Sequence, residues 1–229
     1  AYPSVLNKDS LALPAEVSST KVWSFNGAAN PFKSGITLSN HKLSVPVNTS
    51  ENNVAYQGNV VSGSFAIQDV AASIAFNVKD GDNRYFWQFS KTEGLKRHIQ
   101  IGGTIAQYGD PVPITLKDGE NTFLIATKGN KIYTWLNDTC VDICDTHAEL
   151  PVSGGFGVRT GRAESFSLSN ISVGNDVSVV WAKATITVEK KPAPPIVKKP
   201  TVKLNVKMLP LQKKKSTTAL KASGMIRGD

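Results

Sequence analysis

The chain has 229 residues, a length that fits one large domain or a smaller domain with an appendage. Hydrophobic residues make up 40% of the sequence and charged residues 19%, which supplies a full core and excludes a wholly disordered chain. No run of about 18 apolar residues occurs, so the sequence predicts no membrane-spanning helix.

The formal net charge of +8 comes from the C-terminal end. Residues 190–229 hold ten lysines, Arg227 and one acid, Asp229, whereas the preceding residues hold 15 basic and 17 acidic side chains. The body is therefore nearly neutral, and sequence-independent binding to polyanions is expected of the tail alone. No aromatic residues interleave the tail lysines, so we expect no sequence-specific nucleic-acid binding.

The chain begins at Ala1, and its first residues resemble those left by cleavage of a secretory signal, although an expression fragment can begin in the same way. An extracellular location is therefore the expectation. Three N-x-Ser/Thr sequons predict glycosylation at Asn48, Asn137 and Asn170. In an oxidising compartment the two cysteines, Cys140 and Cys144, are expected to form one local disulfide.

Residues 1–19 are predicted to be an extended lead-in, and strand-like alternation starts at residue 21. The next alternating run covers residues 41–46. Residues 64–79 change phase near Asp69, which predicts either one long bulged strand or two short strands. Residues 85–89 carry aromatic side chains in both phases, so this strand should be central in its sheet.

A hairpin is predicted where residues 122–127 and 131–137 flank Lys128-Gly129-Asn130. Residues 155–158 and 165–168 are expected to pair with each other, with a bulge near Ser169 or Asn170. No stretch keeps a helical period. Regular short strands separated by turns predict an all-β protein, a two-sheet antiparallel β-sandwich over residues 20–189.

Residues 182–188 alternate as a last strand of the body, and the prolines of residues 190–195 predict a stiff linker. The basic tail, residues 190–229, then holds one more amphipathic strand, with its apolar side chains at Val202, Leu204, Val206 and Met208. A lone strand is not stable in water. It must therefore dock on the body of its own chain or add to the sheet of a neighbouring subunit, and the sequence leaves both open.

Four segments, residues 85–89, 95–103, 155–160 and 165–173, resemble the laminin-G-like, concanavalin-like jelly rolls. The nearest version is the accessory sandwich of secreted glycoside hydrolases of the α-L-rhamnosidase type, and the resemblance covers residues 20–175. It implies a jelly roll of two sheets with a carbohydrate-facing surface. It carries no catalytic residue onto this chain.

The residues themselves also predict a protein without catalytic activity. Glycoside hydrolysis needs two carboxyl groups that face each other across a cleft. Most acids here lie in predicted turns, and the Glu-x-Asp-x-x-Glu pattern of jelly-roll glucanases is absent. The histidines His41, His98 and His147 occur singly, without a nucleophile elbow, so no serine-hydrolase triad is indicated.

Two segments offer metal-ligand chemistry. Asp80, Asp82 and Asn83 present oxygen ligands of the kind calcium takes, but the same residues make an ordinary hairpin turn. Cys140, Cys144 and His147 supply at most three zinc ligands, and their spacing is not that of a zinc knuckle, which favours the disulfide. No cofactor is expected other than calcium at the first of these segments.

Sugar recognition needs an aromatic ring to stack on a pyranose and planar polar groups to bind its hydroxyls. Five residues of these types on neighbouring strands form the predicted site: Trp87, Gln88, Arg97, His98 and Trp135. Alternatively, the two tryptophans fill the core. The leading hypothesis is a secreted, non-catalytic module that binds carbohydrate or extracellular matrix. The competing one is a structural subunit of a filament, sheath or capsid that self-associates through the tail strand.

Overall fold

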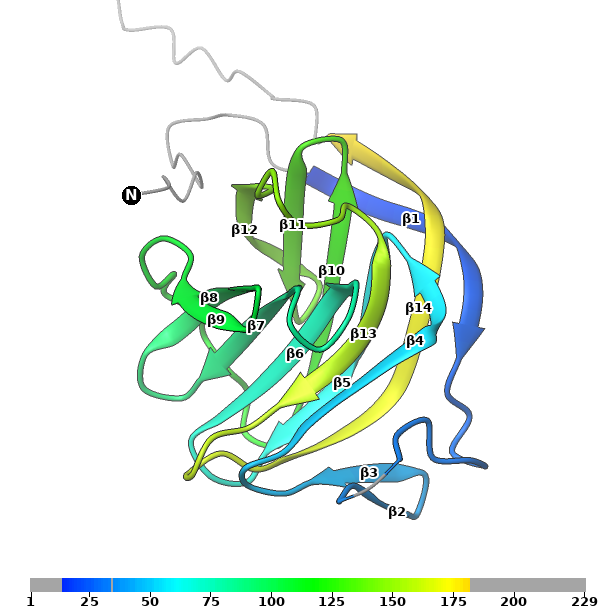
Figure 1. Ribbon diagram of the computed structural model, residues 1–229, viewed down its shortest axis with the longest axis vertical. Helices are drawn as coiled ribbons and strands as arrows, with labels where there is room; N and C mark the ends of the chain where they lie inside the picture. Colours follow the sequence, from blue (N-terminus) through cyan, green and yellow to red (C-terminus); the bar gives the residue numbers. More distant parts are fainter. Residues whose placement is uncertain (1–13, 34, 182–229) are drawn as a thin grey trace, which may run out of the picture. The chain divides into compact units, whose positions relative to one another are not determined.

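Two antiparallel sheets make up the computed structural model, which describes residues 14–33 and 35–181 (Figure 1). Over this part of the chain the regular elements are fourteen strands, β1 to β14, and no helix. The all-β, two-sheet prediction is therefore confirmed. No described segment has the helical length and hydropathy that a bilayer crossing requires.

The larger layer, sheet A, contains eight strands. Their order is β12 (Thr139–Asp145), β11 (Lys131–Leu136), β10 (Glu120–Lys128), β5 (Val60–Ile67), β14 (Phe166–Trp181), β3 (Lys42–Val45) and β2 (Thr37–Ser39). The eighth strand, β1 (Pro14–Ser24), pairs with the distal part of β14. It begins within the segment expected to be an extended lead-in.

The smaller layer, sheet B, contains six strands. Their order is β4 (Ser50–Gly58), β13 (Gly154–Arg159), β6 (Ala71–Val78), β7 (Arg84–Ser90), β8 (Gly94–Ile101) and β9 (Thr104–Gln107). The aromatic strand β7 lies inside the sheet and all its side chains are buried, as predicted for a central strand.

Local sequence signals locate several features correctly. The hairpin of β10 and β11 turns at Gly129, whose φ of +60° lies in the left-handed region. The pairing of β14 with β5 shifts register between Ser169 and Ser172, with Asn170 at a φ of 54°. Of the two alternatives for residues 64–79, the two-strand one holds, because β5 and β6 belong to different sheets and the phase change at Asp69 marks the crossing.

The predicted pairing of residues 155–158 with 165–168 is wrong. β13 pairs with β4 and β6 in sheet B, whereas β14 pairs with β1, β3 and β5 in sheet A. The chain crosses from one layer to the other between these strands. Alternation identified both as strands, but it cannot tell a hairpin from a connection between two sheets.

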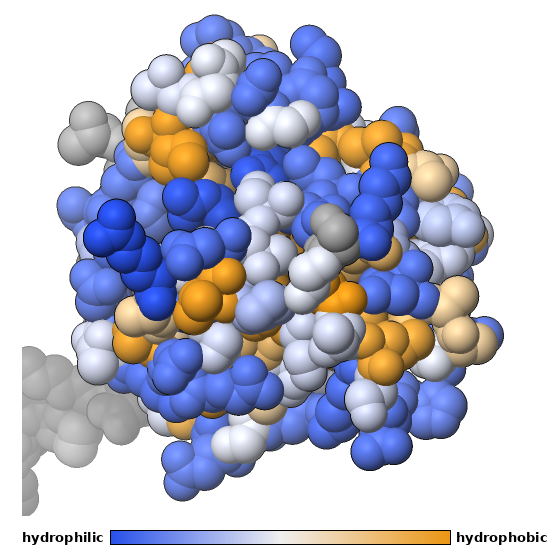
Figure 2. All heavy atoms as spheres, turned by 60° about the horizontal axis from the view of Figure 1, so that its bottom comes forward, coloured by the Kyte–Doolittle hydropathy of each residue, from blue (hydrophilic) through white to orange (hydrophobic). Residues whose placement is uncertain are grey.

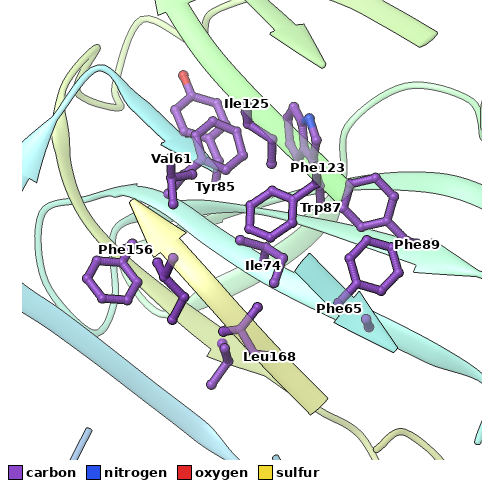
Figure 3. Close-up of a cluster of buried hydrophobic side chains, with 14 of the residues drawn as sticks. Val61, Phe65, Ile74, Tyr85, Trp87, Phe89, Phe123, Ile125, Phe156 and Leu168 are labelled. Carbon is purple, nitrogen blue, oxygen red and sulfur yellow. The ribbon is translucent and has the colours of Figure 1, made fainter. Parts of the chain in front are cut away.

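The core lies between the two inner faces and is rich in aromatic rings (Figure 3). Sheet A contributes Phe65 and Phe123, and sheet B contributes Trp87 and Phe89. The Phe65 and Phe89 ring centroids lie 5.0 Å apart. Trp87 donates its indole N–H to Thr134 Oγ1 across the layers at 2.9 Å, so burial of this ring leaves no unpaired donor.

The disulfide prediction is wrong, because Cys140 and Cys144 are both free and buried. Both lie on β12, where residues four apart are separated by about 13 Å, whereas a disulfide needs Cα atoms within about 7 Å. A bulge at Val141 also reverses the phase of the strand. Cys140 therefore packs outside sheet A beside Tyr133, while Cys144 packs in the core.

Apolar side chains on the face shown in Figure 2 form separate patches among hydrophilic ones. The predicted strand at residues 182–188, the linker and the tail strand at Val202 to Met208 lie outside the described residues. The hypothesis of assembly by strand addition therefore stays a prediction.

Candidate functional site

Strand alternation divides the five predicted sugar-binding residues among three places. Trp87 and Arg97 point into the core and are 0% and 1% exposed. Gln88 and His98 follow them on β7 and β8 and therefore lie on the outer face of sheet B. Trp135 lies on the outer face of sheet A. The buried Trp87 ring is not available for stacking on a sugar.

Arg97 joins the two sheets. Its guanidinium Nη1 lies 3.4 Å from Asp142 Oδ2 on β12, and Nη2 donates to the Asp110 carbonyl at 3.1 Å. Burial raises the pKa of Asp142 to about 6, against the opposing effect of Arg97. This ion pair is fully enclosed, so Arg97 has a structural role in this arrangement.

Trp135 packs beside Tyr133 and Cys140 and is 7% exposed. It lines a hollow of about 270 Å³ together with Asp138 and Asn170. This hollow belongs to sheet A, so Trp135 does not lie on the face that Gln88 and His98 share.

On the outer face of sheet B, polar and aromatic side chains surround two small residues at the centre of the sheet. Residues paired across a sheet project from the same face. One such row crosses all six strands, in the order Asn52, Gly157, Ala75, Phe86, His98 and Gln107. Phe86 and His98 stack, with ring centroids 4.8 Å apart and planes 7° from parallel. In this row the Phe86–His98 pair therefore lies next to the small residues Ala75 and Gly157.

Arg84 spans these two small residues. It starts on β7 and reaches β4, where Nη1 donates to Asn52 Oδ1 at 2.7 Å and Nη2 donates to Ser50 Oγ at 2.9 Å. Its Nε donates to Gln100 Oε1 at 2.9 Å. The small side chains of Ala75 and Gly157 leave room for this reach, and Arg84 is only 2% exposed.

A second arginine reaches toward the same ring. Arg159, half-buried at the end of β13, places its guanidinium carbon 5.1 Å from the Phe86 ring centroid. The guanidinium carbon of Arg84 lies 6.0 Å from that centroid. Both are cation–π distances. Burial, together with the charge of Arg159, lowers the pKa of Arg84.

A polar group lies next to the aromatic pair. Gln88 donates to Glu164 Oε1 at 2.6 Å, and Glu164 Oε2 accepts the Gly161 N–H at 2.8 Å. Ser73 pairs with Gln88 and is fully buried, and its hydroxyl has no hydrogen-bond partner among the described residues. This hydroxyl is 0% exposed and lies beneath the face.

His98 is neutral in this setting. Burial lowers its pKa to about 4, and the charges of Lys96 and Arg159 act in the same direction, against a smaller opposing effect of Glu93. Near neutral pH its imidazole is therefore a hydrogen-bonding group without charge. We define the sheet-B face by its half-buried residues Asn52, Lys96, His98 and Arg159 above the buried Arg84, Phe86 and Gln88.

The segment considered for calcium is organised as a turn. Asp80 Oδ1 accepts the Asp82 N–H and the Asn83 side-chain amide, both at 2.9 Å, and Asn83 Oδ1 accepts the Gly102 N–H. These hydrogen bonds lower the pKa of Asp80. Within residues 14–33 and 35–181, three or more His, Cys, Asp or Glu side chains nowhere come together in an arrangement that could hold a metal ion.

The three sequons differ in accessibility. Asn48 and Asn170 are exposed at left-handed backbone positions. Asn137 is half-buried, donates its amide to Asn121 Oδ1 at 2.9 Å and accepts the Thr122 N–H at 3.0 Å. Glycosylation at the three asparagines stays a prediction.

Sequence reasoning missed Arg84, Phe86 and Arg159, which are central to the sheet-B face. Arg84, Phe86 and Gln88 share one phase of β7, and two of these three residues are polar. The two polar residues in this phase could have indicated that it faces outward. The indication was weak because both phases of the strand also contain aromatic residues.

No protein-family profile matches the sequence, and no curated protein matches it. Solved structures do match. A putative glycosyl hydrolase from Parabacteroides distasonis is 13% identical with a TM-score of 0.50, over 71% of this chain and 98% of that one. This likeness shows a shared β-sandwich fold.

Two further structures match with lower scores. A carbohydrate-binding module, CBM66, from Bacillus subtilis is 16% identical with a TM-score of 0.46, over 72% of this chain and 97% of that one. A B. subtilis protein of unknown function with a galectin-like fold is 10% identical with a TM-score of 0.49, over 72% and 99% of the two chains.

Proposed function

We propose that the described sandwich is a non-catalytic carbohydrate-binding module that takes a saccharide on the sheet-B face. The observation that carries the proposal is the row across all six strands, in which the half-buried His98 ring, stacked on the buried Phe86, shares a face with the Asn52 amide across the small residues Ala75 and Gly157. Saccharide sites combine a ring surface with a few fixed polar groups. The proposed location of the protein is extracellular, an inference from the sequons.

The accessible part of the face has suitable chemistry. Asn52, His98 and Arg159 are half-buried, so each is held in place and still reaches solvent. Asn52 is further fixed by its hydrogen bond from Arg84. Side chains that are already ordered lose little conformational freedom when a ligand binds, which favours affinity.

The surrounding acids support a binding role rather than hydrolysis. A glycoside hydrolase places two carboxyl groups on either side of the scissile bond. Here Glu164 is held by Gln88 and the Gly161 N–H, and Glu93 is paired with Lys96 at 3.1 Å. Each of these carboxyl groups therefore already has a partner in the protein, which favours a binding role in this proposal.

A glycan panel tests the proposal. The intact chain is applied to immobilised neutral and acidic oligosaccharides, and hits are titrated by calorimetry. His98→Ala is expected to weaken binding at least tenfold. His41→Ala, at an exposed position in the turn between β2 and β3, is the matched control and should bind like the wild type. Absence of binding across the panel would overturn the proposal, and so would equal binding by His98→Ala.

A further inference from the structure

We propose that the saccharide bound by the sheet-B face carries an oxyanion, either the carboxylate of a uronic acid or a sulfate ester, which binds at Arg159 above the buried Arg84. This inference rests on the proposed function and names the class of sugar. It follows from two neighbouring arginines that form no salt bridge with an acid in the described part of the chain.

The first step is the environment of Arg84. Arg84 is 2% exposed, and the three acceptors of its hydrogen bonds, Gln100, Asn52 and Ser50, are all neutral. A buried charge is costly unless an opposite charge accompanies it. These hydrogen bonds give the guanidinium N–H groups acceptors, but they do not neutralise its positive charge.

The second step is Arg159, which adds a like charge to the same place. Its guanidinium contacts the Phe86 ring, and no salt bridge joins it to an acid in the described part of the chain. Two arginines around one ring repel each other, and the charge of Arg159 is the second cause, after burial, of the lowered pKa of Arg84. An anion bound at the half-buried Arg159 would relieve that repulsion.

The third step is the position of the nearby acids. Glu93 is engaged with Lys96, and Glu164 is engaged with Gln88. Asp82 lies in an exposed turn, and its attraction is the smallest of the three effects on the pKa of Arg84. Glu51 lies on β4 between Ser50 and Asn52, so strand alternation turns it away from this face. Within the described part of the chain neither arginine therefore forms a salt bridge with an acid.

The fourth step is the kind of anion. Guanidinium groups bind carboxylate and sulfate oxygens through paired, charge-assisted hydrogen bonds. The half-buried His98 ring, stacked on the buried Phe86, and the Asn52 amide across Ala75 and Gly157 suit the ring face and the hydroxyls of a sugar. Because the first 189 residues are nearly neutral overall, this local excess of charge is a property of the face and not of the whole body.

Matched trisaccharides test the inference by calorimetry on the intact chain. Trigalacturonate supplies carboxylates, 6-O-sulfated galactotriose of the same linkage supplies sulfate esters, and unmodified galactotriose is the neutral reference. We expect at least one acidic ligand to bind at least tenfold more tightly than the neutral one, and the comparison of the two acidic ligands identifies the preferred oxyanion. Arg159→Gln should remove that advantage, and Arg159→Lys should retain part of it.

A charge-matched control separates binding at Arg159 from the general attraction of anions to a basic chain. Lys128→Gln removes an equal charge from the exposed end of β10 and should leave every affinity unchanged. Circular dichroism and thermal unfolding establish that Arg159→Gln is folded. If Arg159→Gln binds the acidic ligands as the wild type does, they are held elsewhere and the inference is wrong.

The remaining outcomes separate this inference from the proposed function. If neutral sugars on the glycan panel bind at the His98 site and the acidic trisaccharides have no advantage over galactotriose, the oxyanion inference fails while the proposed function stands. If no saccharide of any class binds, both fail.

Discussion

His98 is a half-buried imidazole whose titration affects folding. Its ordinary pKa of 6.5 applies to the unfolded chain, and burial, with Lys96 and Arg159, lowers the folded pKa to about 4. Between these pH values the unfolded state binds more protons, so the contribution of His98 to stability is present above pH 6.5 and is lost as the pH falls toward 4.

We therefore expect His98→Gln to reduce the acid sensitivity of folding. Between pH 7 and pH 4.5 the wild type should lose up to about 2 kcal/mol more unfolding free energy than the variant. Urea unfolding at several pH values measures the difference. Parallel pH profiles of the two proteins would contradict the lowered pKa.

The cysteines give a second prediction at the scale of single residues. Burial raises the pKa of the Cys140 thiol to about 11 and that of Cys144 to about 12, so both should react slowly in the native protein. Unfolding without reductant should expose two thiols to iodoacetamide, measured by mass spectrometry. A chain that takes up no label under these conditions would contain the disulfide that the structure excludes.

At the scale of elements, the contact between β4 and β13 supports the sheet-B face. A Cβ on Gly157 would lie 2.4 Å from Asn52 Oδ1 and 2.5 Å from the Glu51 carbonyl oxygen. The same Asn52 oxygen accepts the Arg84 hydrogen bond. The glycine therefore permits both the pairing of the two strands and the anchoring of Arg84.

Gly157→Ala is accordingly expected to destabilise the fold by about 1–3 kcal/mol and to weaken saccharide binding. Thermal unfolding and calorimetry measure the two effects. Gly81→Ala is the control, because a Cβ there meets nothing within 4 Å. An unchanged stability for Gly157→Ala would show that β4 moves without cost and that the close approach is unimportant.

At the scale of the whole molecule, polar side chains join the two sheets through the core. Trp87 bonds Thr134, Asn77 donates to Thr127 Oγ1 at 2.9 Å, and Arg97 pairs with Asp142. The ion pair differs from the others because Arg97 Nε and Asp142 Oδ1 have no hydrogen-bond partner among the described residues. Such a pair holds the layers in register while contributing little net stability.

Removal of one partner of that pair should therefore cost more than removal of both. We expect Asp142→Asn to lose about 3–5 kcal/mol, because a buried guanidinium remains without a counter-charge. The double variant Arg97→Met/Asp142→Leu should recover most of this loss. Chemical unfolding of the wild type, the single variant and the double variant gives the comparison. A double variant as unstable as Asp142→Asn would contradict the argument.

Local patterns in the sequence determined the all-β class, the hairpin at Gly129 and the bulge near Asn170. These features depend on neighbouring residues, since side-chain period and turn chemistry act over a few positions. The same patterns found Gln88 and His98, two residues of the sheet-B face, because they identified the strands that carry them.

Tertiary structure decided which phase of each strand faces the core. On β7 aromatic side chains occupy both phases, so the sequence did not determine whether Phe86 or Trp87 points inward, and a shift of one residue exchanges the two faces. The packing of sheet A against sheet B placed Trp87 and Arg97 in the core. It left Arg84, Phe86 and Arg159 outside to form the face, because that choice depends on contacts between residues far apart in the chain.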